Sequence, residues 1–566
     1  MRAREWLEET HGPGFELLRH FLLRFFDSDL ITHPGQTAAA LIGAFSIFAP
    51  WFPFVVGPLK EKYAYVSRLP VAEPYRQAVL ADELWLITLM MSATGLLTAM
   101  KWQALFPGLA DYRVLGPLPL RSRQIFAAKL GSLILVASAA VVTLNLLPGI
   151  GFPAVSASRW AINPSMGARI AAHLGACVSA SYFFFFALVA VQGVLLHLLR
   201  GPRFSRVAGL LQWVLTSAML ILIVVSFSIE PQVTATVLEP RVARWLPPVW
   251  FLGWHQAMLG DPNPAMATLA LEARWGLVGA IGLVLMTYVA GYRRHRRLLV
   301  EGPRPSANHR RWHGLLLDRI VPEPAEQAVT VFLARMLAGS SQHRMVLMGY
   351  GAFGLALSVT AIPGLRRLVA PERLAAACFI YVHVILLILL LMGTRHLFSI
   401  PVELRAHWIF QITEGQGRRR WMRAVDRFVL FWGALVVIAV PFPLEVKLLG
   451  WRAASEAVLI AALGLLIYQA LFSSWAKLPF TCSYLPGKTP MWIRALQLFA
   501  LLGSLPMVNA ILLECLYHPL FYAAALTILA GVSMRLRAAR REAWHDVPLR
   551  YDEAPEPAVH SLNLLR

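Results

Sequence analysis

The sequence has few charged residues for its length, and this scarcity excludes an ordinary soluble protein. Only 15% of the 566 residues are Asp, Glu, Lys or Arg, whereas 57% are hydrophobic. Soluble domains carry about a quarter charged residues. The mean hydropathy is +0.58. This composition predicts an all-α polytopic membrane protein.

Cysteine is scarce as well. The four cysteines, Cys177, Cys378, Cys482 and Cys515, lie far apart and lack metal-ligand spacing. We therefore expect neither a disulfide framework nor a zinc site. A short charged-then-apolar leader with a small-residue cleavage site is also missing before the first apolar segment, so we expect no cleaved signal peptide.

Sequence motifs for catalysis are missing too. A His-Glu-x-x-His pattern is absent, as is a recognisable nucleophile with its base. The stretch "LPGKT", which ends at Thr489, is similar to the end of a phosphate-binding loop, but Cys482 occupies the place of the first glycine. We interpret it as a cytoplasmic turn. The chain is thus expected to be no enzyme and to hold no metal or cofactor, so that energy must come from a partner or an ion gradient.

Long apolar runs dominate what is present. A membrane-spanning helix needs about 20 apolar residues, and about twelve such runs can be placed, with an uncertainty of one. The predicted spans are Thr37 to Val56, Leu80 to Met100, Ile125 to Leu147, Ile170 to Leu199, Val207 to Ile229, Trp275 to Ala290, Met345 to Ile362, Leu374 to Gly393, Phe428 to Leu444, Ala457 to Phe472, Ile493 to Leu513 and Leu520 to Val532. The longest loop predicted outside the membrane, Glu230 to Arg274, leaves little room for a soluble catalytic domain.

The basic residues orient these spans. The chain carries 52 Lys and Arg against 31 Asp and Glu, a net charge of +21. Most of the Lys and Arg fall in the N-terminal arm, the even-numbered loops and the C-terminal tail, so the positive-inside rule places both termini in the cytoplasm. Because the basic residues alternate with apolar spans, they are better explained by topology than by binding to nucleic acid.

The pattern divides the chain into five parts. At the N-terminus, "FELLRHFLLRFF" spaces its apolar residues by three and four, which predicts an amphipathic helix in the membrane interface or, alternatively, a cytoplasmic helix packed on loops. The predicted parts are the interfacial helix 1–36, a first six-span half 37–291, a basic cytoplasmic linker 292–342, a second six-span half 343–535 and a cytoplasmic tail 536–566.

Each half has a basic, proline-bearing loop after its second span. In the first half it is "DYRVLGPLPLRSRQ", in which prolines stiffen the backbone and charged residues can contact a cytosolic surface or merely anchor helix ends to headgroups. The proposed docking residues are Asp111, Arg113, Pro117, Pro119, Arg121 and Arg123, and those of the second-half loop are Pro401, Glu403, Arg405 and Trp408. This positional correspondence predicts an internal duplication with two pseudo-repeated halves.

A resemblance to a known family gives these loops a role. "DYRVLGPLPLRSRQIFAAKLGSL" resembles the loop after the second helix in permease subunits of bacterial ABC exporters of the type-2 permease superfamily, and "LPPVWFLG" and "KLPFTCSYLPGK" are similar to stretches of large permease-like proteins of that kind. The resemblance implies a multi-pass exporter component of the bacterial inner membrane. It also implies a separate ATP-binding subunit, holding ATP and Mg, docked on the cytoplasmic loops.

This chain differs from a single permease subunit of that family because it carries about twelve spans rather than about six. A fused pair would form a complete pore for an exported substrate that the sequence does not identify. The second loop lacks the Leu-Pro-Leu-Pro form, which leaves open whether both halves dock an ATPase.

An ion-gradient-driven secondary transporter is the alternative, and a membrane-embedded enzyme is a third class. Buried titratable groups in spans are functional candidates by default. His383, near the middle of the eighth predicted span, is the clearest intramembrane polar candidate, followed by Asp82, Glu83 and Lys129 near span ends. For His383 we favour an interhelical hydrogen bond over a proton relay.

Overall fold

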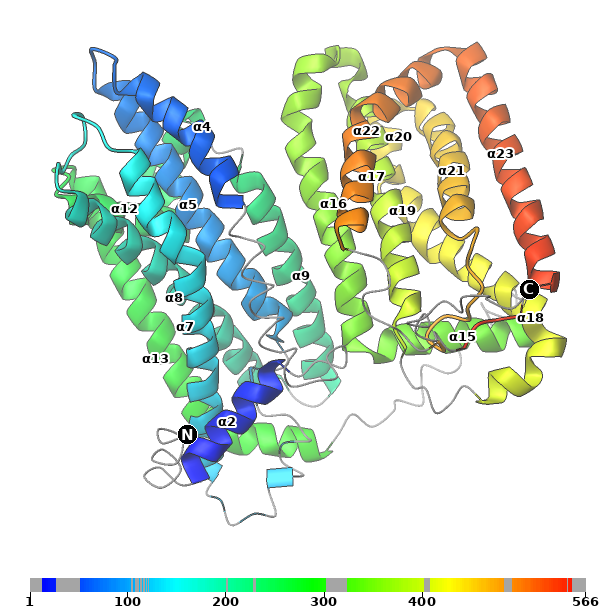
Figure 1. Cartoon of the computed structure of the whole chain (residues 1–566), viewed down its shortest axis with the longest axis horizontal. Coiled ribbons are helices and arrows are strands. Elements are labelled where there is room, and N and C mark those ends of the chain that lie inside the picture. The colour runs from blue at the N-terminus through cyan, green and yellow to red at the C-terminus, as the bar shows by residue number, and fades with distance from the viewer. Residues whose placement is uncertain are drawn as a thin grey trace, which may run out of the picture. The chain divides into compact units, whose positions relative to one another are not determined.

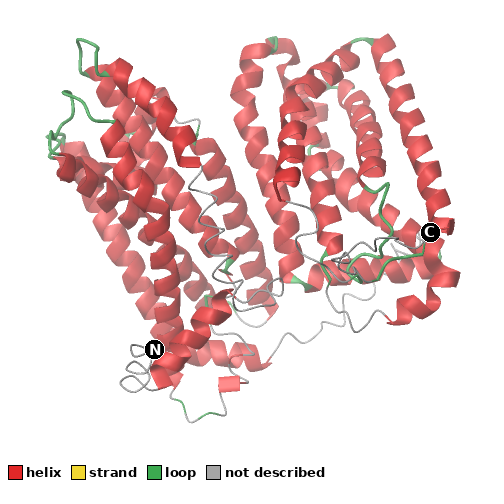
Figure 2. Ribbon diagram, viewed as in Figure 1, coloured by secondary structure: helices red, strands yellow, loops and turns green. Residues whose placement is uncertain are grey.

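The computed structural model describes residues 13–26, 51–102, 105–106, 111, 114–115, 118, 120, 122–199, 202–227, 231–301, 323–401, 408–482, 491–546 and 548–551. The described residues form helices and loops and no strand (Figure 2). The chain divides into two compact units, Met1–Pro305 and Ser306–Arg566. The division falls inside the predicted linker.

The described residues contain ten helices that are long and apolar enough to cross a membrane. This finding confirms the prediction of an all-α polytopic membrane protein. Of the first predicted span, Thr37 to Val56, residues 37–50 lie outside the described residues. The eleventh predicted span falls on α22 (Met491–Tyr517), whose described apolar part, Gly503–Tyr517, is shorter than the other ten. The count of about twelve stays a prediction.

In the first unit, α5 (Glu73–Met100) forms the centre of the bundle (Figure 1). In the most apolar 18-residue stretch of α5, 83% of the residues are buried. The helix packs against α8 (Met166–Leu198) and α9 (Pro202–Ser226). Small residues allow this close packing, as is usual between membrane helices. At Gly95 an added Cβ would lie 2.6 Å from the Phe184 ring of α8.

Two further long helices complete this bundle, α7 (Ser122–Val155) and α13 (Pro264–Glu301). The sixth predicted span covered only Trp275 to Ala290, but α13 begins earlier and continues past it. Pro264 stands at the first position of α13, where a proline is tolerated, and beyond the apolar run Gly291 and the charged residues continue the helix because no proline interrupts it.

The segment predicted as the longest outer loop is largely helical. It contains α10 (Pro231–Val237), α11 (Pro240–Ala243) and α12 (Pro247–Leu259). Helix α12 packs against α8 and α13. At Gly253 an added Cβ would lie 2.9 Å from the backbone oxygen of Met266, so this position requires glycine for α12 to approach α13.

In the second unit, α17 (Pro371–Ser399) packs against α16 (Ser341–Leu368), α21 (Arg452–Leu471) and α22. The third long helical segment of this unit is continuous and consists of α18 (Trp408–Val429), the π-helical turn η4 (Leu430–Leu435) and α19 (Val436–Ala439). Helix α20 (Phe442–Leu449) follows it, and α23 (Pro519–Asp546) is the last helix. Gly450, with φ +63°, forms the tight turn between α20 and α21.

Two shorter helices pack at bundle ends. Helix α2 (Pro13–Phe26) lies against α7 in the first unit, and α15 (Pro324–Gly339) lies against α18 in the second (Figure 1). On α15, the carboxylate of Glu326 is buried and accepts a hydrogen bond of 2.6 Å from Arg427 of α18. Helix α15 occupies part of the predicted linker 292–342, because its apolar side chains pack into the second unit, as Leu333 does.

Candidate functional site

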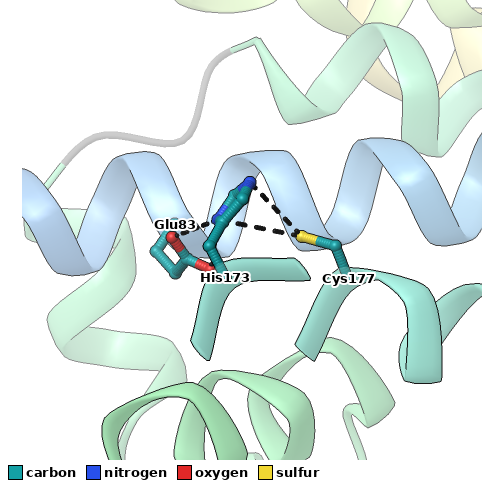
Figure 3. A group of neighbouring side chains, drawn as sticks. All are labelled: Glu83, His173 and Cys177. Atoms are coloured by element: carbon teal, nitrogen blue, oxygen red, sulfur yellow. Dashed lines mark hydrogen bonds and ion pairs between the residues drawn. The ribbon is translucent and has the colours of Figure 1, made fainter. Parts of the chain in front are cut away.

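The first unit contains a buried cluster of a carboxylate, an imidazole and a thiol (Figure 3). His173 and Cys177 stand one helical turn apart on α8, which places both side chains on one face. Glu83 reaches them from α5, and the Nδ1 atom of His173 lies 2.9 and 2.8 Å from its two carboxylate oxygens. The Cys177 Sγ atom lies 3.8 Å from the Nε2 atom of the same ring.

A second imidazole extends the cluster. His255 of α12 places its Nε2 atom 3.7 Å from a carboxylate oxygen of Glu83. The side chains of Glu83, His173 and His255 are at most 5% exposed. One carboxylate therefore faces two imidazoles, and the group can share or pass a proton.

A pocket leads to this cluster. It has a cavity volume of about 90 Å³ and is lined by His173 and His255, with Arg169, Tyr75 and Trp160 among the other lining residues. A water molecule needs about 10–15 Å³ of such volume, so the pocket holds several waters or a small ion. The guanidinium of Arg169 is nearly buried, and its Nε and Nη1 atoms make no hydrogen bond among the described residues.

Asp82, although next to Glu83, belongs to a separate group. Its carboxylate accepts hydrogen bonds from the Lys62 ammonium at 2.7 Å and from the Tyr63 hydroxyl at 2.7 Å. These contacts neutralise Asp82 and tie α4 (Trp51–Val66) to α5. We assign Asp82 a structural role.

The second unit contains a cluster of one histidine and two carboxylates. His383 of α17 lies between Glu445 of α20 and Glu456 of α21. Its Nε2 atom is 3.2 Å from Glu445 Oε1, and its Nδ1 atom is 3.4 Å from Glu456 Oε1. The three side chains are at most 1% exposed, and their six nitrogen and oxygen atoms make no well-formed hydrogen bond within the described part of the chain.

The proposed docking residues are described only in part. Of the first-half set, Asp111 is buried and its Oδ1 atom lies 4.0 Å from the Nε2 atom of His20 on α2. Arg113, Pro117, Pro119 and Arg121 lie outside the described residues, and Arg123 lies in the first turn of α7 without a described side chain. Of the second-half set, Pro401 is half-buried after α17 and Trp408 is 62% exposed at the start of α18, whereas Glu403 and Arg405 lie outside the described residues.

Lys129, the last intramembrane candidate, is buried near the start of α7. Its ammonium lies 5.0 Å from the centre of the Phe21 ring of α2, within the range of a cation–π contact. Lys129 thus helps to hold α2 on α7 and lies in neither histidine cluster.

Sequence reasoning named one residue of each cluster as a candidate, Glu83 and His383, but not the partners. His173, His255, Glu445 and Glu456 were not singled out. One rule could have found some of them: every titratable residue inside or beside a predicted span is a candidate. This rule selects His173 on the fourth span and Glu445 at the end of the ninth.

Comparison with known proteins finds no matching family model, no matching curated protein and no matching solved structure.

Proposed function

We propose that this chain is the membrane-spanning permease component of an ATP-driven exporter in the bacterial inner membrane, with both termini in the cytoplasm and a separate ATP-binding subunit docked on the cytoplasmic loops. One observation carries the proposal: described residues of the segment between the second and third spans pack against α2 and α7. Leu115 of that segment is buried in one cluster with Leu17 and Phe21 of α2 and Ile125 and Ala128 of α7.

This packing matters because a docking element must transmit force. A segment that is only anchored to headgroups would leave its apolar side chains at the membrane surface. Leu115, by contrast, is 7% exposed and Asp111 is 4% exposed, whereas Val114 and Leu118 of the same segment are 63% and 48% exposed and are left for a partner or for headgroups. A partner that pushes on the segment therefore pushes directly on the start of α7 and on the amphipathic helix α2.

The second unit offers a comparable surface on α18. Trp408, Ile409 and Ile412 are at least half exposed at its start, and the same helix carries Arg418, Arg419 and Arg420. Exposed apolar side chains beside basic ones suit a docked subunit or a headgroup layer. This arrangement supports a second docking surface without the Leu-Pro-Leu-Pro form.

The two clusters support the idea of two repeated halves. In the first unit the acid lies on the second predicted span and the imidazole on the fourth, as Glu83 and His173. In the second unit the imidazole, His383, lies on the second span of its half, and an acid, Glu456, directly precedes the fourth span on the same helix. Both halves thus pair an acid with an imidazole at corresponding helices, although the acid and the imidazole have exchanged places. This correspondence fits an internal duplication and a single-chain pore.

Affinity purification of the chain in mild detergent tests the proposal. We expect an ATP-binding subunit to co-purify and its ATPase rate to depend on the permease. The variant Arg121→Glu/Arg123→Glu should lose most of this subunit, because repulsion replaces attraction. The matched reversal Arg366→Glu/Arg367→Glu, on the exposed end of α16, should retain it. If both variants recover the same amount of the ATP-binding subunit, the loop that contains Arg121 and Arg123 only anchors helix ends to headgroups.

An ion-gradient-driven transporter is the second candidate, favoured by a specific observation. Glu83, His173 and His255 form a buried proton-binding group beside a pocket, and such groups mark ion pathways in membrane proteins. Proteoliposomes of the purified chain, loaded with a pH-sensitive dye, test this function. Proton entry that stops in Glu83→Gln, with no co-purifying ATP-binding subunit, would replace the exporter proposal by a secondary transporter.

A further inference from the structure

We propose that His383, Glu445 and Glu456 bind a divalent transition-metal ion, such as Zn²⁺ or Mn²⁺, inside the second unit. This inference goes beyond the proposed function, since neither a permease nor its docking surface requires a metal. It rests on the geometry of the cluster, on its charge and on its contrast with the cluster of the first unit.

The geometry matches a metal site. One ligand atom from each of the three side chains can be chosen so that all lie within 4.8 Å of one another. Metal–ligand bonds of about 2.0–2.2 Å in tetrahedral geometry place neighbouring nitrogen and oxygen ligands about 3.3 Å apart. The Nε2 atom of His383 and the Oε1 atom of Glu445 are 3.2 Å apart. Because Glu456 lies at the other ring nitrogen, its carboxylate would have to rotate toward Glu445 for the three groups to bind one ion.

The charge of the cluster calls for a cation. Glu445 and Glu456 are 0% exposed, and no Lys or Arg among the described residues forms an ion pair with either carboxylate. Protonated His383 would balance only one of the two negative charges. An uncompensated buried carboxylate costs several kcal/mol or more, whereas a divalent ion balances both.

Protons are the competing way to neutralise the cluster, and the first unit shows what that looks like. There Glu83 and His173 satisfy each other directly, with both carboxylate oxygens hydrogen-bonded to one ring nitrogen. In the second unit the two carboxylates lie 3.2 and 3.4 Å from different ring nitrogens, and none of the six polar atoms makes a well-formed hydrogen bond among the described residues. Buried polar atoms without such a partner call for a ligand, and a cation can bind both carboxylates and the imidazole at once.

The donor set selects the class of metal. One imidazole nitrogen and two carboxylates favour Zn²⁺ or Mn²⁺, whereas soft thiolate ligands, which would favour Cu⁺, do not take part. The donors come from α17, α20 and α21, and the Gly450 turn connects the last two helices. A bound ion would therefore hold this turn onto α17.

Metal content measures the site directly. The purified full chain is incubated with Zn²⁺ or, separately, Mn²⁺, freed of excess metal and analysed for metal per chain. The isosteric variant Glu445→Gln/Glu456→Gln and the single variant His383→Gln are compared with wild type. Glu514→Gln, which removes a half-exposed carboxylate from the same unit, is the matched control.

We expect both site variants to bind one ion per chain fewer than wild type, and the control to bind as much as wild type. A further ion in the cluster of the first unit would appear equally in all four proteins, so the difference reports this site alone. The added metal should raise the melting temperature of wild type more than that of the site variants, since the lost native-state site no longer contributes to the shift. Equal metal content in wild type and both site variants, or no metal in wild type, would overturn the proposal.

Discussion

The hydrogen-bonded pair of Glu83 and His173 allows a quantitative prediction. Both side chains are at most 1% exposed, so Glu83→Ala leaves the His173 imidazole without its carboxylate, and His173→Ala leaves the Glu83 carboxylate with only His255, at 3.7 Å. Removing one member of a buried ion pair costs about 3–5 kcal/mol. The double variant removes both charges together. Its cost should fall short of the sum of the two single costs by about 1–3 kcal/mol.

The size of that coupling decides the charge state of the pair. Neutral interhelical hydrogen bonds in membranes average about 0.6 kcal/mol, so a larger coupling indicates a carboxylate facing an imidazolium. The assay is reversible unfolding in detergent with increasing SDS, followed by tryptophan fluorescence for wild type, both single variants and the double. Glu73→Ala, at the exposed start of α5, is the control and should not change the unfolding free energy. Strictly additive costs would refute the interaction.

Three further predictions concern two other contacts and the topology of the chain. Phe21→Ala should loosen α2 from α7 at a cost of about 3–5 kcal/mol, because the ring is fully buried; hydrogen exchange should accelerate in α2 and stay slow in α5. Asp426→Asn should lower the SDS midpoint of the second unit, since Arg540 is buried against that carboxylate. Glu514→Gln, which removes the half-exposed carboxylate that pairs with Arg373, should not. With Cys378 replaced by Ser, an impermeant thiol reagent added to intact cells should label Asp261→Cys and not Asn308→Cys; labelling of Asn308→Cys would reverse the topology.

Hydropathy predicted the helices of this protein because the bilayer imposes length and composition on each span separately. It did not predict where the helices end. Helix α13 runs to Glu301, well beyond the apolar run, since charged residues that leave the membrane continue a helix without cost. The helices α12 and α15 were also missed, because they are too short to be recognised as spans and are fixed by packing on neighbouring helices.

The polar clusters were predictable only one residue at a time. Glu83 and His173 are 90 positions apart in the chain, and no spacing rule connects residues on different helices. Their proximity follows from the packing of α5 on α8, which small residues such as Gly95 permit. A single sequence contains the residues of such a site but not the contacts, so His383 could be identified as a candidate while Glu445 and Glu456 could not be assigned to it.

The exchanged positions of acid and imidazole in the two units lead to a last prediction. If both halves require an acid–imidazole pair between these two helices, it should matter less which helix carries the acid than that the pair is present. Glu83→His/His173→Glu exchanges the members and reproduces the order of His383 and Glu456. Each single substitution creates two facing imidazoles or two facing carboxylates, which repel when charged. The exchange variant should therefore unfold at a higher SDS concentration than either single variant. If it is no more stable than the weaker single variant, the pairs depend on local geometry alone, and their correspondence offers no support for duplication.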